Sequence, residues 1–213
     1  MKISKIILVG FLSLTLNAYA KTDSETHLLK YIDKITSYQC RFVQSIDDPD
    51  GNAVSKMNGE LSVLRPGRFM WKTNPPDPIV VVADGKTLWT YDIELEQVTQ
   101  QDLKKALASS PAAILIGSAD QIMADFNVTE IHTGACESKQ QDCFILEPKH
   151  SEENFGQIKL IFRDDKLVEV SMDDPLGQHV LTKFTDINVN IALNNQLFNF
   201  VPPADVDVIK PGS

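Results

Sequence analysis

The sequence predicts a mainly β protein with a few helices, an α+β fold built on one curved antiparallel sheet of about 11 strands. From Tyr38 onward, apolar residues recur mostly at every second position, and turn motifs rich in Asp, Gly and Pro separate the runs. Helical spacing appears in only two stretches, one before Tyr38 and one at 101–125. Most connections are too short for the crossovers that parallel strands need, so the strands should pair antiparallel.

Residues 1–20 have the parts of a secretory signal peptide. Two lysines precede an apolar run at 6–16, and the small-residue cleavage motif AYA follows at 18–20. The run is shorter than the roughly 20 apolar residues that a membrane-spanning helix needs, so no stable membrane insertion is expected. We therefore predict an exported protein whose mature chain, 21–213, is a single domain.

The composition excludes two classes of partner. The chain has 20 Lys and Arg against 29 Asp and Glu, a net charge of −9, and the predicted signal peptide would remove basic residues only. Nucleic acids and anionic membranes bind basic clusters, and no run of Lys or Arg occurs in the mature chain. Neither partner is expected. No Ser/Gly-rich linker and no repeat divides the mature chain, which supports one domain.

The first element predicted in the mature chain is an amphipathic helix over 24–37. Ser24 is a suitable N-cap residue, because its hydroxyl can accept a hydrogen bond from the first turn. The apolar positions follow helical spacing: Leu28, Leu29, Ile32 and Ile35.

Strands are predicted from Tyr38 to the end of the chain. The strongest local signal is Asp84-Gly85 between two strand-forming runs, since glycine accepts a positive φ without steric cost and so permits a tight hairpin. An extended segment with Phe69 and Trp71 on one face precedes this hairpin. The other predicted strands are 38–46, 54–64, 95–100, 126–132, 143–148, 157–163, 166–172, 179–189 and 197–201, with a short edge strand at 206–209.

Two or three short helices are expected in 101–125. Pro111 suits the first turn of one of them, because the N–H that proline lacks has no partner there. The segment that follows, 112–116, is apolar on nearly every side. Such a helix is either fully buried or covers something other than the protein's own core, and both interpretations stay open.

Three cysteines are present, at positions 40, 136 and 143. In an exported protein, Cys136 and Cys143 flank a polar loop and are well placed for a disulfide across a hairpin. Cys40 would then be a buried free thiol. A zinc site is disfavoured, because the spacing of this pair matches no zinc motif and His132 precedes it at no recognised ligand spacing.

The sequence contains no recognised catalytic motif. The four histidines match no Ser-His, Cys-His or metal-binding spacing, and paired acidic residues fall in turns, where Asp is favoured for its local hydrogen bonds. The histidines are His27, His132, His150 and His179. We expect no enzymatic activity, no cofactor and no metal site. A secreted hydrolase with an unrecognised site is the alternative.

The stretch 65–92 resembles the LolA family of periplasmic outer-membrane lipoprotein carriers. That family has R-P-x-x-F-x-W, a Pro-rich link and then v-x-D-G-K-x-L-W-x-Y-D, where this chain has RPGRFMW and VADGKTLWTYD. The detailed match covers mainly 65–99 and 111–116. The resemblance implies that the sheet is an unclosed β-barrel and that short lid helices cover its opening.

The resemblance also implies a function. The protein would shelter the acyl chains of lipoproteins and carry them from the inner-membrane ABC-type complex LolCDE to the outer-membrane receptor LolB. A monomer is expected, and Arg65 would latch the lid helices in the empty form. The lipid-anchored receptor shares the fold, but no Cys follows the predicted signal peptide. The residues implied for the acyl-chain cavity are Phe69, Trp71, Ile114, Leu115 and Ile116.

The roles implied for Arg65 and for the five apolar residues have simpler alternatives. Arg65 before Pro66 could merely fix a turn, and the five apolar residues could be ordinary core. Ala112 and Ala113 stand where bulkier apolar residues can occur in the family, which predicts a roomier cavity or a looser lid. A periplasmic adaptor that contacts proteins through an exposed face of Phe69 and Trp71 is the remaining alternative function.

Overall fold

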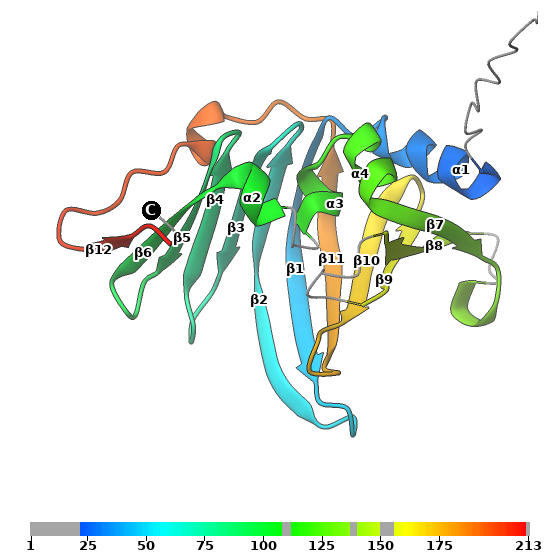
Figure 1. Cartoon of the computed structure of the whole chain (residues 1–213), viewed down its shortest axis with the longest axis horizontal. Coiled ribbons are helices and arrows are strands. Elements are labelled where there is room, and N and C mark those ends of the chain that lie inside the picture. Colours follow the sequence, from blue (N-terminus) through cyan, green and yellow to red (C-terminus); the bar gives the residue numbers. More distant parts are fainter. Residues whose placement is uncertain (1–21, 108–111, 137–139, 150–155, 212–213) are drawn as a thin grey trace, which may run out of the picture.

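The computed structural model describes residues 22–107, 112–136, 140–149 and 156–211. The predicted signal peptide and Pro111 lie outside the described residues. Short helices lie on one face of a single large sheet (Figure 1). The helices are α1 (Asp23–Ile32), α2 (Leu103–Leu107), α3 (Ala112–Ile116) and α4 (Ala119–Asp125), with 3-10 turns η1 (Gly134–Cys136) and η2 (Asn195–Phe198). The strands are β1 (Ser37–Asp47), β2 (Ala53–Leu64), β3 (Arg68–Thr73), β4 (Ile79–Asp84), β5 (Thr87–Asp92), β6 (Gln97–Asp102), β7 (Phe126–Ile131), β8 (Gln141–Pro148), β9 (Ile158–Arg163), β10 (Lys166–Asp173), β11 (His179–Val189) and β12 (Asp207–Ile209).

The sheet is open. Its strand order is β12-β6-β5-β4-β3-β2-β1-β11-β10-β9-β8-β7, and no pairing among the described residues joins the two ends. Every neighbouring pair is antiparallel except β12 with β6. The predicted fold class is therefore confirmed, including the short edge strand near the C-terminus, although that strand pairs in parallel.

The first helix starts and ends earlier than its sequence pattern predicts. Thr22, not Ser24, is the N-cap: its side chain accepts from the Glu25 N–H, and the Glu25 carboxylate accepts from the Thr22 N–H. Ser24 lies inside α1, and its hydroxyl accepts from the N–H of Glu130 on β7. Because α1 ends at Ile32, the last predicted turn of helix is instead the connection to β1.

The prediction of a strand at 197–201 is wrong. The 3-10 turn η2 (Asn195–Phe198) overlaps the start of this segment, and its N-cap, Asn194, accepts a hydrogen bond from the Gln196 N–H. Side-chain bonds of this local kind compete with a strand ladder. Phe200 then packs beside Trp89 of β5, with ring centroids 5.7 Å apart. The C-terminal segment thus packs on the sheet without joining it until β12.

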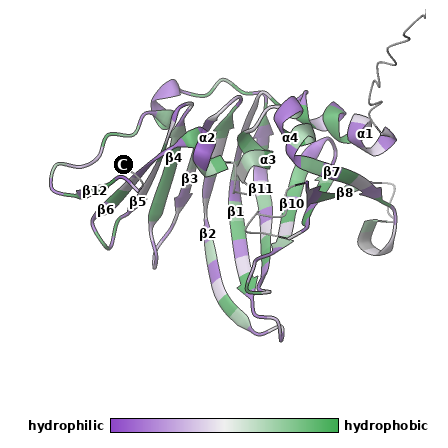
Figure 2. Cartoon of the chain, viewed as in Figure 1, coloured by the Kyte–Doolittle hydropathy of each residue, from purple (hydrophilic) through white to green (hydrophobic). Residues whose placement is uncertain are grey.

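The main core lies between the sheet and the helices α1, α2, α3 and α4, on what we call the helix-covered face. Its fully buried side chains include Phe42 of β1, Phe126 of β7, Phe144 of β8 and Ile116 of α3. Burying one such side chain contributes about 1.5–3 kcal/mol, so these contacts fix the helices on the sheet. Figure 2 shows that α3 is hydrophobic, whereas α2 is mixed. No helix among the described residues is long and apolar enough to cross a bilayer.

A disulfide joins Cys136 of η1 to Cys143 of β8. The two residues and Ile161 of β9 form a small buried cluster apart from the main core. Cys40 is a buried free thiol. Burial raises the pKa of Cys40 to about 12, so the thiol stays protonated and unreactive at neutral pH.

Replacing both Cys136 and Cys143 with alanine is expected to lower the free energy of unfolding by about 2–3 kcal/mol, because the disulfide restricts the unfolded chain. The measurement is urea unfolding followed by circular dichroism, with and without a reductant. The reductant should destabilise the unmodified protein and leave the double variant unchanged. An unaltered unfolding midpoint in the double variant would contradict this prediction.

Candidate functional site

A cavity of about 310 Å³ lies between α3 and the helix-covered face of the sheet. We call it the α3 cavity. Phe69 and Trp71 of β3 form one wall, and Ile114 and Leu115 of α3 form its cover. The remaining walls come from β1, β4, β10 and β11, through Gln44, Val81, Val170, Met172, Val180, Thr182 and Phe184.

The lining of the α3 cavity is apolar apart from Gln44 and Thr182, which are hydrogen-bonded to each other. The Gln44 Nε2 donates to the Thr182 Oγ1 at 2.9 Å. This bond pairs one donor and one acceptor of the two side chains, so an apolar ligand that covers them leaves fewer polar atoms without a partner. The cavity is therefore suited to an apolar ligand with no fixed polar group, such as a hydrocarbon chain.

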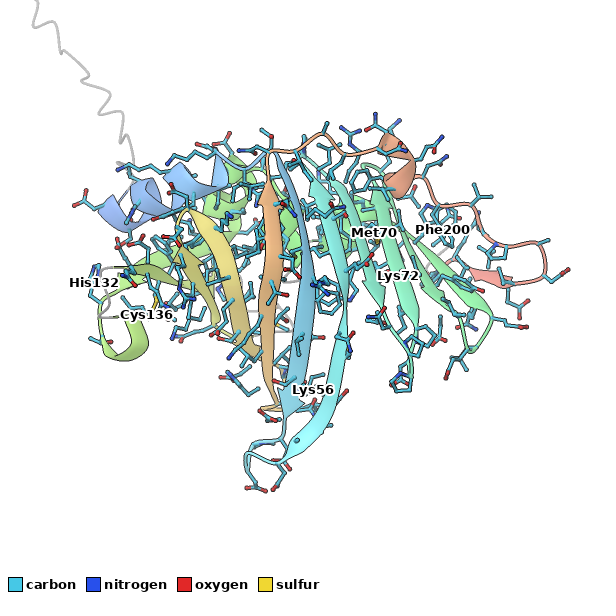
Figure 3. All side chains as sticks on the ribbon, turned by 180° about the vertical axis from the view of Figure 1, so that it is seen from behind. Lys56, Met70, Lys72, His132, Cys136 and Phe200 are labelled. Atoms are coloured by element: carbon cyan, nitrogen blue, oxygen red, sulfur yellow. A yellow bond between two sulfur atoms is a disulfide. The ribbon has the colours of Figure 1, made fainter. Side chains whose placement is uncertain are left out.

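The wall formed by β3 depends on a glycine in the neighbouring strand. Trp71 stacks on Phe42 of β1, with ring centroids 3.6 Å apart and planes inclined by 25°. Gly59 of β2 leaves space for this stack, because a Cβ there would lie 2.8 Å from the Phe42 ring and 1.9 Å from the Lys72 carbonyl oxygen. Strand alternation directs Met70 and Lys72 to the opposite face, which Figure 3 views from behind.

Arg65, in the connection between β2 and β3, joins the ends of two helices. Its Nε donates to the Leu115 carbonyl oxygen at 3.1 Å, and its Nη2 donates to the Ile114 carbonyl oxygen at 3.0 Å. Its Nη1 donates to the carbonyl oxygen of Ile32, the last residue of α1, at 3.3 Å. The last carbonyl groups of a helix have no partner within the helix. One guanidinium therefore caps both α1 and α3.

The backbone beside Arg65 completes the cap of α3. The N–H of Gly67 donates to the Ile116 carbonyl oxygen at 3.0 Å, and Gly67 has a φ of +76°, a conformation that favours glycine. The N–H of Gly117 donates to the Ala113 carbonyl oxygen at 2.7 Å. Each carbonyl from Ala113 to Ile116 thus receives a donor, and three of the four hold α3 to Arg65 and its loop.

The charge of Arg65 suits its position, because the carbonyl end of a helix carries a partial negative charge. Burial lowers the pKa of Arg65 to about 10, and the nearby carboxylate of Asp33 acts in the opposite direction. The guanidinium is therefore protonated at neutral pH. Hydrogen bonds from a charged donor contribute about 1.5–3 kcal/mol each, so the position of α3 depends strongly on one side chain.

Four of the five residues expected in the cavity line it together: Phe69, Trp71, Ile114 and Leu115. Ile116 does not. Its side chain is 1% exposed and borders a different hollow of about 840 Å³ beside α2. Phe69 is only 6% exposed, so it does not form the exposed aromatic face that an adaptor function would require.

Sequence reasoning missed most of the cavity walls and one partner of Arg65. The lining residues of β10 and β11 alternate along their strands, so each common face could have been recognised. Which face borders a cavity, however, depends on where α3 lies across the sheet. The carbonyl of Ile32 gives no sequence signal, because every residue has one. The missed residues are Gln44, Val81, Val170, Met172, Val180, Thr182, Phe184 and Ile32.

Comparison with known proteins places this architecture in a family. The model of the family described as "Outer membrane lipoprotein carrier protein LolA" matches residues 33–201. An outer-membrane lipoprotein carrier protein of Legionella pneumophila (strain Paris) is 34% identical over 207 residues, which cover 97% of this chain and 99% of the relative. The corresponding protein of Hahella chejuensis is 35% identical over 213 residues, which cover 99% of each chain.

Solved structures share the fold at much lower identity. An uncharacterized conserved protein from Thermus thermophilus superposes with a TM-score of 0.53 at 15% identity, covering 88% of this chain and 99% of that one. A DUF1329 family protein from Desulfovibrio piger gives 0.51 at 13% identity, covering 82% and 94%. The family match over 33–201, together with relatives above 30% identity along nearly the whole chain, shows that this protein belongs to the outer-membrane lipoprotein carrier protein LolA family.

Proposed function

We propose that this protein is a periplasmic carrier that shelters the acyl chains of lipoproteins in the α3 cavity. It receives them from the inner-membrane complex LolCDE and delivers them to the outer-membrane receptor LolB. The observation that carries the proposal is an apolar cavity whose cover, α3, is held by hydrogen bonds from one arginine and its loop. An ordinary core helix would leave no space beneath it.

A hydrolase is not supported. The LolA family consists of carrier proteins that act as chaperones and not as enzymes. The α3 cavity itself also lacks a catalytic constellation, because its two polar side chains, Gln44 and Thr182, bond to each other. General acid-base or nucleophilic chemistry needs a titratable group or an activated nucleophile at the site.

The energetics of acyl-chain burial require a cavity that resists opening. Each methylene removed from water contributes about 0.8 kcal/mol, so several long chains would give tens of kcal/mol of gross stabilisation. A carrier that bound this tightly without an opposing cost would not release its cargo. The cost in this proposal is the opening of α3, which breaks the hydrogen bonds from Arg65 and Gly67.

The size of the cavity supports the same mechanism. Its volume of about 310 Å³ is at the lower end of the range for ligand sites, which is about 300–1,000 Å³. Several long acyl chains need more room than this. Loading therefore requires α3 to move away from β3, β10 and β11, and the closed arrangement corresponds to the empty carrier.

The proposal is tested by incubating the purified protein with a detergent-solubilised triacylated lipoprotein, removing the detergent, and separating the mixture by gel filtration. The two proteins should elute together as a soluble complex. The matched control is the same lipoprotein produced without its acyl chains, which should elute separately. Failure of the acylated form to co-elute, or equal co-elution of the unacylated form, would contradict the proposal.

A further inference from the structure

A cluster of metal-ligating side chains lies near the middle of α1, five residues before the Ile32 carbonyl that Arg65 contacts, where α1 packs on β7 and β8. His27 of α1, Glu130 of β7 and Asp142 of β8 each offer one ligand atom, and these atoms all lie within 4.8 Å of one another. All three side chains are partly buried. Sequence spacing could not reveal the cluster, because its members come from three separate segments.

We propose that His27, Glu130 and Asp142 form a binding site for a divalent transition metal, with Zn²⁺ as the preferred ion. The site is independent of the α3 cavity and of the proposed carrier function. One imidazole and two carboxylates form a mixed nitrogen and oxygen ligand set, which suits Zn²⁺. Mg²⁺ and Ca²⁺ prefer sites made of oxygen ligands only.

The distances fit a tetrahedral ion after small side-chain adjustments. Ligand atoms about 2.0–2.2 Å from a tetrahedral Zn²⁺ lie roughly 3.3–3.6 Å from one another. In the structure, the Nδ1 of His27 is 2.9 Å from the Oε2 of Glu130. The ion would replace this hydrogen bond by separating the two atoms slightly while drawing Asp142 inward.

The surroundings already orient the three ligands. The hydroxyl of Tyr31 donates to the Oδ2 of Asp142, which is the type of outer hydrogen bond that positions a ligating carboxylate. The His27 ring packs against Tyr31 and Phe144, with centroids 5.5 Å away in each case. The imidazole is therefore confined between α1 and the sheet with its Nδ1 toward Glu130.

The local charge favours a cation. The carboxylates of Glu130 and Asp142 each place an oxygen within 4.8 Å of the other. A dication between the carboxylates would reduce their mutual repulsion.

A fourth protein ligand is within reach. His132 follows β7 directly, and its Nε2 lies 3.6 Å from the Oε1 of Glu130. Its side chain is 75% exposed and lies at the same end of the molecule as Cys136 in Figure 3. Rotation of this exposed side chain would complete a site with four protein ligands, and water would otherwise take the fourth position.

Metal binding would fasten the N-terminal half of α1 to the β7-β8 hairpin. The C-terminal end of α1 is held by Arg65 through the Ile32 carbonyl, so the metal would add a second point of attachment for the helix. Because the site requires the folded arrangement of three segments, binding should stabilise the folded state.

The test is a titration of the tag-free protein with ZnCl₂, followed by isothermal calorimetry and thermal unfolding. We expect one Zn²⁺ per chain and a higher unfolding midpoint, whereas MgCl₂ at the same concentration should change neither signal. Co²⁺ should give the visible absorption bands of a tetrahedral site. His27→Gln and Asp142→Asn should each weaken Zn²⁺ binding at least tenfold.

The chain offers a matched control for His27. The Nδ1 of His179 lies 2.9 Å from the Oδ1 of Asp173, the same separation as in the His27–Glu130 pair, and this pair belongs to no three-ligand group among the described residues. His179→Gln should therefore bind Zn²⁺ like the unmodified protein. The proposal is wrong if the unmodified protein shows no Zn²⁺ response, or if His27→Gln and Asp142→Asn bind with unchanged affinity. Comparing calorimetric affinities rather than absolute midpoints separates lost metal binding from any destabilisation by the substitutions.

Discussion

Arg65→Leu is expected to load lipoprotein normally but to transfer it to the receptor at least tenfold more slowly. The substitution removes the hydrogen bonds to the carbonyls of Ile114, Leu115 and Ile32. Each such bond from a charged donor contributes about 1.5–3 kcal/mol, and about 1.4 kcal/mol corresponds to a factor of ten. In the proposed mechanism these bonds belong to the closed, empty form, so their loss should disfavour closure and retain the cargo. The measurement is the time course of lipoprotein transfer from the preformed complex to LolB-containing vesicles.

Arg68→Leu is the matched control for this prediction. Arg68 lies three residues further along, and its Nη1 donates to the Asn195 Oδ1 at 2.8 Å, away from α3. This variant loses the same charge but should transfer at the unmodified rate. Arg65→Lys should be intermediate, because an ammonium lacks the planar fork that reaches two helices. Unimpaired transfer by Arg65→Leu would show that Arg65 only shapes the turn before β3.

Much of the fold followed from the sequence because its signals are local. The Asp84-Gly85 hairpin is a local signal of this kind: Ala83 pairs with Leu88, the Asp84 carboxylate accepts from the N–H groups of Lys86 and Thr87, and Gly85 has a φ of +102°. The predicted elements are wrong where side-chain hydrogen bonds override apolar periodicity. Because Thr22 caps α1, the helix starts earlier than predicted, and because Asn194 caps η2, a 3-10 turn lies where a strand was predicted.

The candidate site was less predictable because it depends on contacts between distant segments. The resemblance pointed to Arg65, Phe69 and Trp71, yet the partners of Arg65 are backbone carbonyls, which no residue pattern encodes. The apolar run of α3 did not reveal which of its sides meets the cavity. Ile114 and Leu115 face it while Ile116 does not, and this depends on how the loop of Gly67 holds the helix.

Val170→Glu is expected to reduce lipoprotein loading at least tenfold with a small effect on folding. Val170 of β10 is partly buried and forms part of the wall of the α3 cavity. Because Val170 is only partly buried, a glutamate there can be hydrated in the empty protein, but acyl chains would cover the carboxylate and remove that hydration. Burying an unpaired charge costs several kcal/mol, which opposes the burial of the methylene groups. Co-elution with a triacylated lipoprotein on gel filtration measures the loss, and thermal unfolding verifies that the variant is folded.

Val43→Glu provides the same chemical change on the other face of the sheet. Val43 of β1 is 39% exposed, its neighbour Gln44 lines the cavity, and its partner across the strands is Lys183, which would face the new carboxylate. This variant should load normally.

Val170→Trp, which fills space without adding charge, should reduce loading as Val170→Glu does, because both act on the same volume beneath α3. If both Val170 variants load like the unmodified protein, the acyl chains are held elsewhere, and the 840 Å³ hollow beside α2 becomes the next site to obstruct.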